Sequence, residues 1–152
     1  MKGLIQRVSQ ASVAVDGKVI GEIAQGLLLF LGIERNDDTA SAEALGRRIA
    51  GYRVFPDAQG RMNQSLLDTG GSLLVVSQFT LAADTRSGTR PGFSTAAAPE
   101  QAESLYQSFL AVVRELLGSH RVACGQFGAD MKVALVNDGP VTFLLESGGA
   151  IK

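Results

Sequence analysis

Apolar runs of strand length occur along most of the chain. Residues 2–9 and 12–15 alternate apolar and polar positions, and Asp16 and Gly17 after them are typical of a hairpin turn. Residues 27–33 (LLLFLGI) are continuously apolar, as expected for a strand that is covered on both faces. The other segments with a strand-like pattern are 72–81, 121–127, 130–137 and 141–147. The last two are separated by three turn residues, so we expect them to pair as a hairpin.

Two segments have the apolar spacing of helices. The first covers roughly 40–52 and follows three possible capping residues at 37–39. The second begins at Pro99, which the first turn of a helix tolerates, and is expected to end at Gly118. Strands therefore precede, separate and follow two helices. This order predicts an α/β layered protein with a partly antiparallel sheet and both helices on one side.

Composition is that of a globular protein. The chain has 152 residues, of which 45% are hydrophobic and 19% are charged, so we expect a single domain over residues 1–152. The formal net charge of −1 argues against a strongly basic protein that coats nucleic acid, but it leaves a local positive groove possible. No apolar run approaches the ~18 residues of a membrane span, and we expect a soluble cytoplasmic protein without membrane partners.

Few side chains are suited to metal binding or nucleophilic catalysis. The chain has one cysteine and one histidine, too few for an internal disulfide or a zinc site, so we expect neither metal nor cofactor. His120 follows the second helix, where a histidine is usually a solvated cation, and Cys124 lies within a strand, where a cysteine is usually a small apolar residue. The common dinucleotide, P-loop and hydrolase motifs are absent from the sequence.

Two polar segments are not fully explained by strand patterning. Residues 77–81 (SQFTL) end an apolar strand beside 82–98, which has no apolar period and which we expect to be a functional loop. The hydroxyls of 77–81 could also simply satisfy the strand end by hydrogen bonds. Residues 137–142 (NDGPVT) are either an ordinary turn or a site whose carbonyls face a ligand, since Pro140 has no N–H.

Together these two segments resemble the signatures of the D-aminoacyl-tRNA deacylase family, an SQFTL strand end and an NxGPVT turn. Residues 1–17, 55–66, 88–93 and 127–142 are also similar to that family in the same order, so the resemblance covers the whole chain. It implies a three-layer β/β/α sandwich and a homodimer with active sites at the subunit interface. The implied reaction is hydrolysis of the ester that joins a D-amino acid to the 3′ adenosine of tRNA, with glycyl-tRNA mischarged on other tRNAs as the achiral borderline substrate.

The resemblance also implies a role for each motif residue. Ser77, Gln78, Phe79 and Thr80 would line the ester, with the Phe79 N–H or Thr80 as oxyanion contacts. A threonine hydroxyl needs a neighbouring base before it can attack, and the single histidine lies elsewhere in the sequence. A water positioned by the substrate's ribose 2′-hydroxyl is therefore favoured over Thr80 as the nucleophile.

Chiral selection is implied for the second motif. The residues assigned to substrate binding and selection are Gly139, Pro140, Arg7, Asn137 and Met131. In this family the Gly139-Pro140 bond is cis, and the turn enters the pocket of the partner subunit, where it rejects the L-enantiomer. Arg7 is expected to brace the turn from the facing strand.

Two other functions stay open from the sequence. A non-catalytic RNA-binding or nucleotide-binding module would need no acid or base residues. A protein that binds single-stranded bases should present several aromatic residues for stacking. This chain has no Trp, 2 Tyr and 7 Phe, most of them in apolar runs. A small-molecule esterase lacks an activated nucleophile in the sequence.

Overall fold

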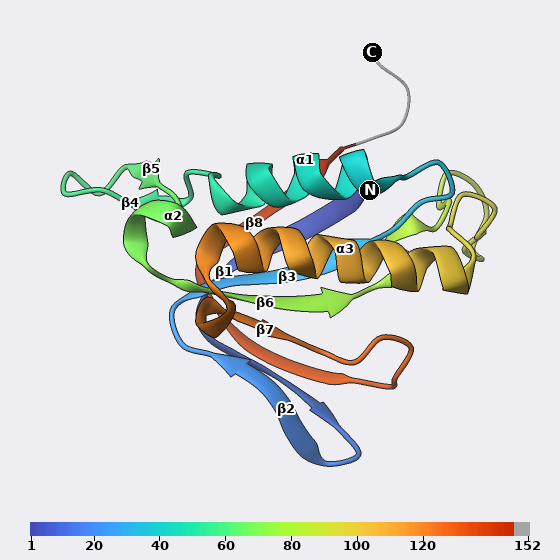
Figure 1. Cartoon of the computed structure of the whole chain (residues 1–152), viewed down its shortest axis with the longest axis horizontal. Coiled ribbons are helices and arrows are strands. Elements are labelled where there is room, and N and C mark those ends of the chain that lie inside the picture. The colour runs from blue at the N-terminus through green and yellow to red at the C-terminus, as the bar shows by residue number, and fades with distance from the viewer. Residues whose placement is uncertain (148–152) are drawn as a thin grey trace.

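The computed structural model describes residues 1–147, which form a six-stranded mixed sheet, a small ribbon and two main helices (Figure 1). The strands of the large sheet are β1 (Lys2–Val15), β2 (Lys18–Ile23), β3 (Gly26–Gly32), β6 (Ser72–Ser77), β7 (Val122–Cys124) and β8 (Lys132–Glu146). The ribbon consists of β4 (Phe55–Pro56) and β5 (Met62–Gln64). The helical elements are α1 (Thr39–Ala50), α2 (Leu66–Thr69), α3 (Pro99–Leu117) and the 3-10 turns η1 (Phe79–Ala82) and η2 (Ser119–Arg121). Within residues 1–147 no helix is long and apolar enough to cross a membrane.

The sheet is organised around β1, which pairs with three strands. Its residues 2–8 pair antiparallel with β3 and its residues 11–15 with β2, while β8 follows β1 along both halves. β3, β6 and β7 run parallel to one another. Because β1 passes from one neighbour to the next, the sheet curves into a nearly barrel-shaped form (Figure 1). The α/β class and the mixed sheet are confirmed, and the β layers belong to one continuous sheet.

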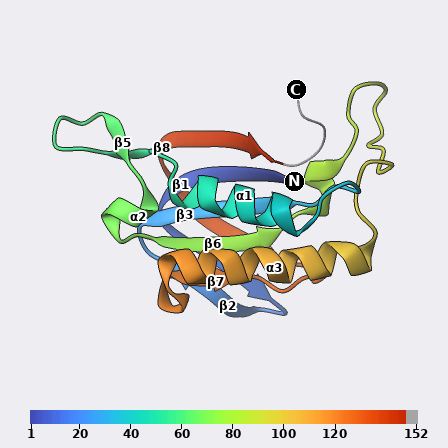
Figure 2. The same cartoon turned by 45° about the horizontal axis from the view of Figure 1, so that its top comes forward.

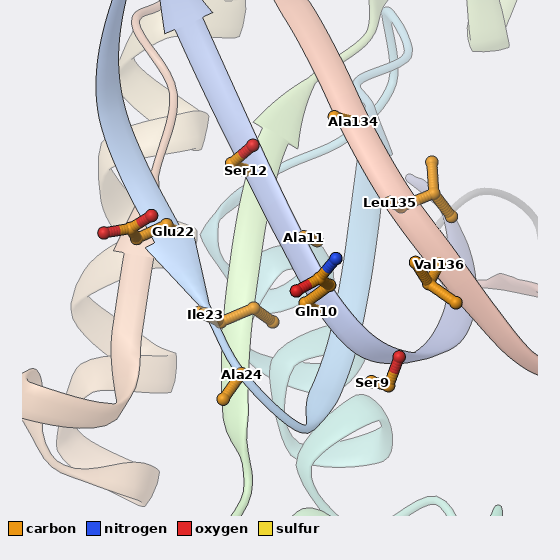
Figure 3. Close-up of a pocket in the computed structure, with 10 residues that line it drawn as sticks. All are labelled: Ser9, Gln10, Ala11, Ser12, Glu22, Ile23, Ala24, Ala134, Leu135 and Val136. Atoms are coloured by element: carbon orange, nitrogen blue, oxygen red, sulfur yellow. The ribbon is translucent and has the colours of Figure 1, made fainter.

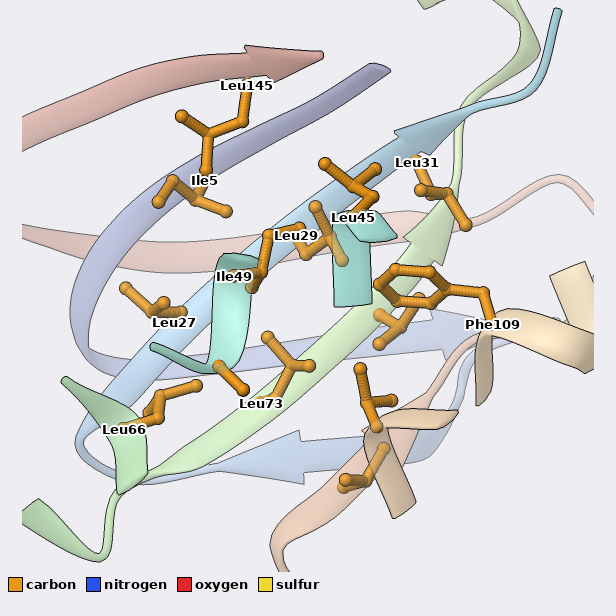
Figure 4. Packing of buried hydrophobic residues seen from close by; sticks show 14 of the residues in the cluster. Ile5, Leu27, Leu29, Leu31, Leu45, Ile49, Leu66, Leu73, Phe109 and Leu145 are labelled. Carbon is orange, nitrogen blue, oxygen red and sulfur yellow. The ribbon is translucent and has the colours of Figure 1, made fainter. Parts of the chain in front are cut away.

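Apolar side chains fill a core on each face of this sheet. On the helix side, Leu29 of β3 lies in one cluster with Leu45 of α1 and Phe109 of α3 (Figure 4). Leu28 of β3 points to the opposite face and lies in a second cluster with residues of β1, β6 and β8. The prediction that 27–33 forms a strand covered on both faces is confirmed.

The two main helices lie beside each other on the first face (Figure 2). The Asp38 side chain accepts a hydrogen bond from the Ser41 N–H at the start of α1, and the bonds from Ser41 lower the pKa of the Asp38 carboxyl. A Cβ on Gly46 would lie only 2.8 Å from Val112, so this glycine permits the close approach of α1 to α3. α3 begins at Pro99 as predicted.

Two strands are shorter than the sequence predicts. β6 ends at Ser77, so the remainder of 72–81 is not strand but leads into η1. η1 packs over the end of β3, since a Cβ on Gly32 would lie 2.9 Å from the Leu81 Cβ. The predicted strand 121–127 is reduced to β7, because Arg121 belongs to the 3-10 turn η2 and the residues after Cys124 lead into a turn at 127–128.

The predicted hairpin between 130–137 and 141–147 is wrong. Both segments belong to β8, which keeps one direction and stays antiparallel to β1. Between two consecutive register pairs, β8 contains residues 138–141 where β1 contains only Arg7. The turn residues therefore form a wide bulge within a strand, a structure that uses the same residue types as a hairpin turn.

Replacement of Gly26 by alanine is expected to destabilise the fold. A Cβ there would lie 1.8 Å from the backbone oxygen of Ser72, so the β3–β6 pairing would have to shift. We expect a loss of about 3 kcal/mol, which corresponds to a fall in Tm of roughly 6–12 °C by scanning calorimetry. Gly92→Ala is the control, because the nearest atom to its Cβ is 3.8 Å away and its Tm should stay within about 2 °C of the parent. Equal Tm changes in the two variants would contradict this account.

Candidate active site

The SQFTL segment leaves the sheet where the parallel strands end. Ser77 is the last residue of β6 and pairs with Leu31 of β3, and the Gln78 N–H still donates to the Leu31 carbonyl at 2.8 Å. The chain then turns into η1, which carries Phe79 with 66% of its surface exposed. The carboxyl edge of parallel strands is a common position for ligand sites.

The start of η1 presents free backbone donors. The Leu81 and Ala83 N–H groups donate to the carbonyls of Gln78 and Thr80, both at 3.1 Å. The N–H groups of Phe79 and Thr80 have no acceptor among residues 1–147. Two adjacent amides without partners can together stabilise an oxyanion.

Thr80 has no base that would make it a nucleophile. Its hydroxyl accepts a hydrogen bond from Gln78 Nε2 at 2.5 Å. His120 is exposed and lies in η2, and the next residue, Arg121, donates to the Gly71 carbonyl just before β6 begins. The length of β6, at ~3.3 Å per residue, separates this end from Thr80 by roughly 15–20 Å. A Thr–His pair cannot form within the chain.

Cys124 is also unsuited to attack a substrate here. It packs against the core under the helices, and its Sγ lies 3.8 Å from Arg114 Nη2. Burial and the neighbouring thiol raise the pKa of the Tyr106 hydroxyl beside it. Among the residues that the structure describes, no group of three or more histidine, cysteine, aspartate or glutamate side chains could hold a metal ion.

The loop 82–98 contributes an aromatic contact that sequence reasoning does not identify. The rings of Phe79 and Phe93 lie with their centroids 5.3 Å apart, and Phe93 is 41% exposed. Thr95 Oγ1 donates to the Ala82 carbonyl at 2.6 Å and thus ties the loop to η1. The only sequence signal for Phe93 is its place at the end of the GTRPGF segment, 88–93.

The bulge in β8 is held by side chains from both of its sides. Arg7 Nε donates to the Asp138 carbonyl at 2.9 Å, and Asn137 Oδ1 accepts from the Val141 N–H at 2.9 Å. The Gly139-Pro140 peptide bond is cis, as expected, and both residues are exposed. Asn137 and Arg7 therefore provide hydrogen-bond partners for the backbone on both sides of the bulge. Its tip, Gly139 and Pro140, faces solvent.

Within one copy of the chain, the two motifs lie toward opposite ends of the sheet. Along β3 the bulge is level with Leu27, whereas Ser77 is level with Leu31. Four residues at ~3.3 Å and three strand spacings of ~4.8 Å, from β8 through β1 and β3 to β6, separate the motifs by on the order of 15–20 Å. The structure does not bring Gly139 or Pro140 to the SQFTL segment of the same chain.

Met131 lies on the SQFTL side of the molecule. A Cβ on Gly125 would be 2.6 Å from Met131 Sδ, and the Gly125 N–H donates to the Val75 carbonyl near the end of β6. Met131 is half-buried against the second core. The predicted residues therefore divide into two groups, one near the SQFTL segment and one at the β8 bulge. The first group is Ser77, Gln78, Phe79, Thr80 and Met131, and the second is Arg7, Asn137, Gly139 and Pro140.

A hollow of about 600 Å³ is lined mainly by β1, β2 and β8, and it reaches Val136, the residue before Asn137 (Figure 3). Its lining residues are Ser9, Gln10, Ala11, Ser12, Glu22, Ile23, Ala24, Ala134, Leu135 and Val136. None of the predicted site residues lines it. No motif in the sequence points to it.

The chain is similar to known proteins along nearly its whole length. The family model described as D-Tyr-tRNA(Tyr) deacylase matches residues 4–146. The D-aminoacyl-tRNA deacylase of Marinobacter nauticus is 68% identical over 148 residues, which cover 97% of this chain and 95% of that protein. The protein of the same name from Stutzerimonas stutzeri is 62% identical, with 97% of this chain and 100% of that protein covered.

Solved structures have the same fold. One titled "c-Myc DNA Unwinding Element Binding Protein" is similar with a TM-score of 0.94 and 41% identity, covering 98% of this chain and 100% of that chain. Another, titled "Structural Analysis of a probable eukaryotic D-amino acid tRNA deacylase", has a TM-score of 0.84, 17% identity and coverage of 95% and 98%, a likeness of fold alone. On the family match and the identities over nearly the full chain, this protein belongs to the D-aminoacyl-tRNA deacylase family of ester hydrolases.

Proposed function

We propose that this D-aminoacyl-tRNA deacylase cleaves its ester at the start of η1 and selects the enantiomer with the β8 bulge of a second copy of the chain. The observation that carries the proposal is the separation of the two motifs within one chain. Each motif displays groups without partners, the amides of Phe79 and Thr80 at one end and the exposed tip of the bulge at the other. A homodimer that joins the two ends completes a site.

Backbone amides would supply the main stabilisation of the transition state. As water adds to the ester carbonyl, negative charge develops on its oxygen, and the N–H groups of Phe79 and Thr80 are placed to donate to it. The ribose 2′-hydroxyl of the substrate orients the attacking water, and the 3′ oxygen leaves with a proton to give free tRNA and the amino acid. Thr80, Ser77 and Gln78 shape the pocket around the ester, with Met131 at its side.

Rejection of the L-enantiomer would come from the rigid tip of the bulge. Its carbonyls accept from the α-amino group of a D-residue, while the side chain of an L-residue would meet the same backbone. Gly139 is needed there, because a Cβ at φ +149° would lie 2.6 Å from Val141 Cγ2 and 2.8 Å from the Val141 nitrogen. Glycine has no side chain to reject, so we also propose that glycyl-tRNA mischarged on other tRNAs is hydrolysed.

Exposed apolar residues on β8 support contact between two chains. β8 pairs only with β1, so its other edge is free within residues 1–147. Val136 is 47%, Phe143 37% and Leu144 49% exposed. Large apolar side chains along an open strand edge are typical of surfaces that pack against another chain.

A nucleic-acid-binding role without catalysis is the second candidate. The exposed Phe79–Phe93 pair could stack on unpaired bases, and one similar solved structure is titled as a DNA-unwinding-element binding protein. Such a module would bind tRNA and leave its ester intact.

The proposed function predicts enantiomer-selective loss of the ester. Matched D- and L-tyrosyl-tRNA, incubated with the protein and followed by release of the labelled amino acid, should differ in rate by about 100-fold or more in favour of the D form. Equal rates would contradict selection by the bulge. Binding of both substrates with no release of either amino acid would favour the module without catalysis.

Removal of the Phe79 N–H should lower kcat. Proline fits the first position of a helix, and Gln78 before it (φ −140°, ψ 84°) lies outside the α region that a following proline disfavours, so Phe79→Pro deletes the donor with little backbone change. We expect kcat to fall by about 10²–10³-fold, the usual effect of losing one oxyanion donor. Phe79→Ala is the matched control, since it removes the same ring and keeps the N–H. A loss in Phe79→Ala as large as that in Phe79→Pro would assign the effect to the ring.

Complementation between two inactive variants should reveal a shared site. Phe79→Pro damages the ester end and Gly139→Ala damages the bulge. A mixed dimer, purified through two different tags after co-expression, has one site with both defects and one with neither, so it should recover about half of the wild-type activity. Each variant purified alone is the control and should be inactive. An inactive mixed dimer would contradict a site built from two chains.

A further inference from the structure

The loop 82–98 contains a hairpin that the proposed hydrolysis does not use. The Asp84 N–H donates to the Gly92 carbonyl at 2.7 Å and the Gly92 N–H to the Asp84 carbonyl at 3.0 Å, which closes residues 84–92 into a hairpin. Arg86 and Arg90 lie two residues beyond this bridge, one on each arm, and both are exposed. We call residues 84–92 the arginine hairpin. It projects from the body of the molecule between η1 and α3 (Figure 2).

The positive charges of this region are only partly neutralised. Arg86 pairs with Asp84 through Nε to Oδ1 and Nη2 to Oδ2, both at 2.8 Å, and these bonds lower the pKa of Asp84 to about 2. Arg90 has no carboxylate within 4 Å anywhere in residues 1–147. Like charges on facing arms destabilise a hairpin. One carboxylate therefore offsets one of two arginines, and the other is open to an anion from outside the chain.

A third arginine lies against the base of the hairpin. The exposed guanidinium of Arg35 donates to the Ser94 carbonyl, and the Arg35 N–H donates to the Thr95 carbonyl at 2.9 Å. Arg35 also has no ion-pair partner in the part of the chain that the structure describes. Its charge therefore adds to the positive charge that Arg90 gives this loop.

The base of the hairpin is joined directly to the proposed site. Thr95 donates to Ala82 at the end of η1, and the ring of Phe93 contacts that of Phe79 at a tilt of 42°. Phe79 is the residue whose N–H we assign to the oxyanion. An ester held at η1 would therefore lie beside this loop. The phosphates nearest to the 3′ end of such an RNA would then face the long side chains of the hairpin.

We propose that the arginine hairpin, with Arg35 at its base, binds the phosphates of the tRNA strand that leads into the site. This inference rests on the proposed function, since it takes its direction from an ester held at η1. The planar guanidinium fork of arginine matches a phosphate group and stays charged at all relevant pH values. The chain as a whole has a net charge of −1, so attraction of a polyanion depends on local positive charge such as this.

The direct test is equilibrium binding of deacylated tRNA, which contains no ester to hydrolyse. At low salt, Arg90→Gln should raise Kd by about five- to tenfold and reduce the slope of log Kd against log salt by about one. Arg90→Lys, which keeps the charge, should recover part of the affinity. The matched control is Arg47→Gln, because Arg47 lies on α1 and pairs with Glu43 at 3.0 Å, so the same charge is removed far from the loop.

A second measurement separates phosphate binding from a change in the site. Hydrolysis of D-aminoacyl-tRNA should lose more in kcat/KM on Arg90→Gln than hydrolysis of D-aminoacyl-adenosine, which has no phosphate. An unchanged Kd, an equal rise in Kd for Arg47→Gln, or equal losses on both substrates would each overturn the proposal. Failure of the wild type to prefer the D substrate would instead contradict the proposed function, and the tRNA titration would still decide whether the hairpin binds RNA.

Discussion

The mismatch between β1 and β8 opposite Arg7 is the constraint on which the geometry of the β8 bulge depends. Residues 138–141 of β8 face a single residue of β1, and the extra backbone groups must find partners other than the ladder. Arg7 and Asn137 supply those partners. Arg7 also donates from Nη1 to the Val54 carbonyl at 2.7 Å, which ties the bulge to the segment after α1. The exposed tip is thus part of the sheet and is fixed on both sides.

The same strand also sets the position of the other end. Because residues 2–8 of β1 pair with β3, the parallel strands β3, β6 and β7 point away from the bulge, and their carboxyl ends lie at the far edge of the sheet. The polypeptide leaves β6 there and presents N–H groups for which no residue of the described chain provides a hydrogen-bond acceptor. Both ends therefore offer backbone groups where many enzymes offer acids, bases or metal ligands. A site built on backbone groups, as proposed, needs none of the familiar catalytic motifs, and the sequence contains none of them.

The main elements follow from the sequence because each carries a pattern typical of one kind of structure. The run 27–33 has the length and apolar character of a strand buried on both faces, and the stripe after Pro99 has the spacing of an amphipathic helix. The bulge is different, since Asp138, Gly139 and Pro140 suit a hairpin equally well. What decides is Arg7, a residue of another strand that satisfies the Asp138 carbonyl and so lets β8 continue. Periodicity along one segment carries no information about such a partner.

The candidate site shows the same division. That 77–81 and 137–142 are candidate site segments could be inferred from polar residues at strand ends and from the family resemblance. The distance between them could not, because it depends on how β1 is shared among its three neighbours. The position of Phe93 and the hairpin that carries Arg90 could not be predicted for another reason. A loop without an apolar period gives no indication of which of its residues contact the candidate site.

Selection by a rigid bulge has a consequence for how the proposed site must be assembled. An acceptor that discriminates the two hands of one α-carbon must be held in place, and a bulge within a ladder meets that condition better than a free loop. The ladder that fixes the bulge also prevents it from crossing to η1 of its own chain. A bulge that is fixed in the sheet therefore cannot also reach η1 of the same copy. A second copy removes the conflict, because each chain can keep its bulge fixed and still place it against the amides of its partner.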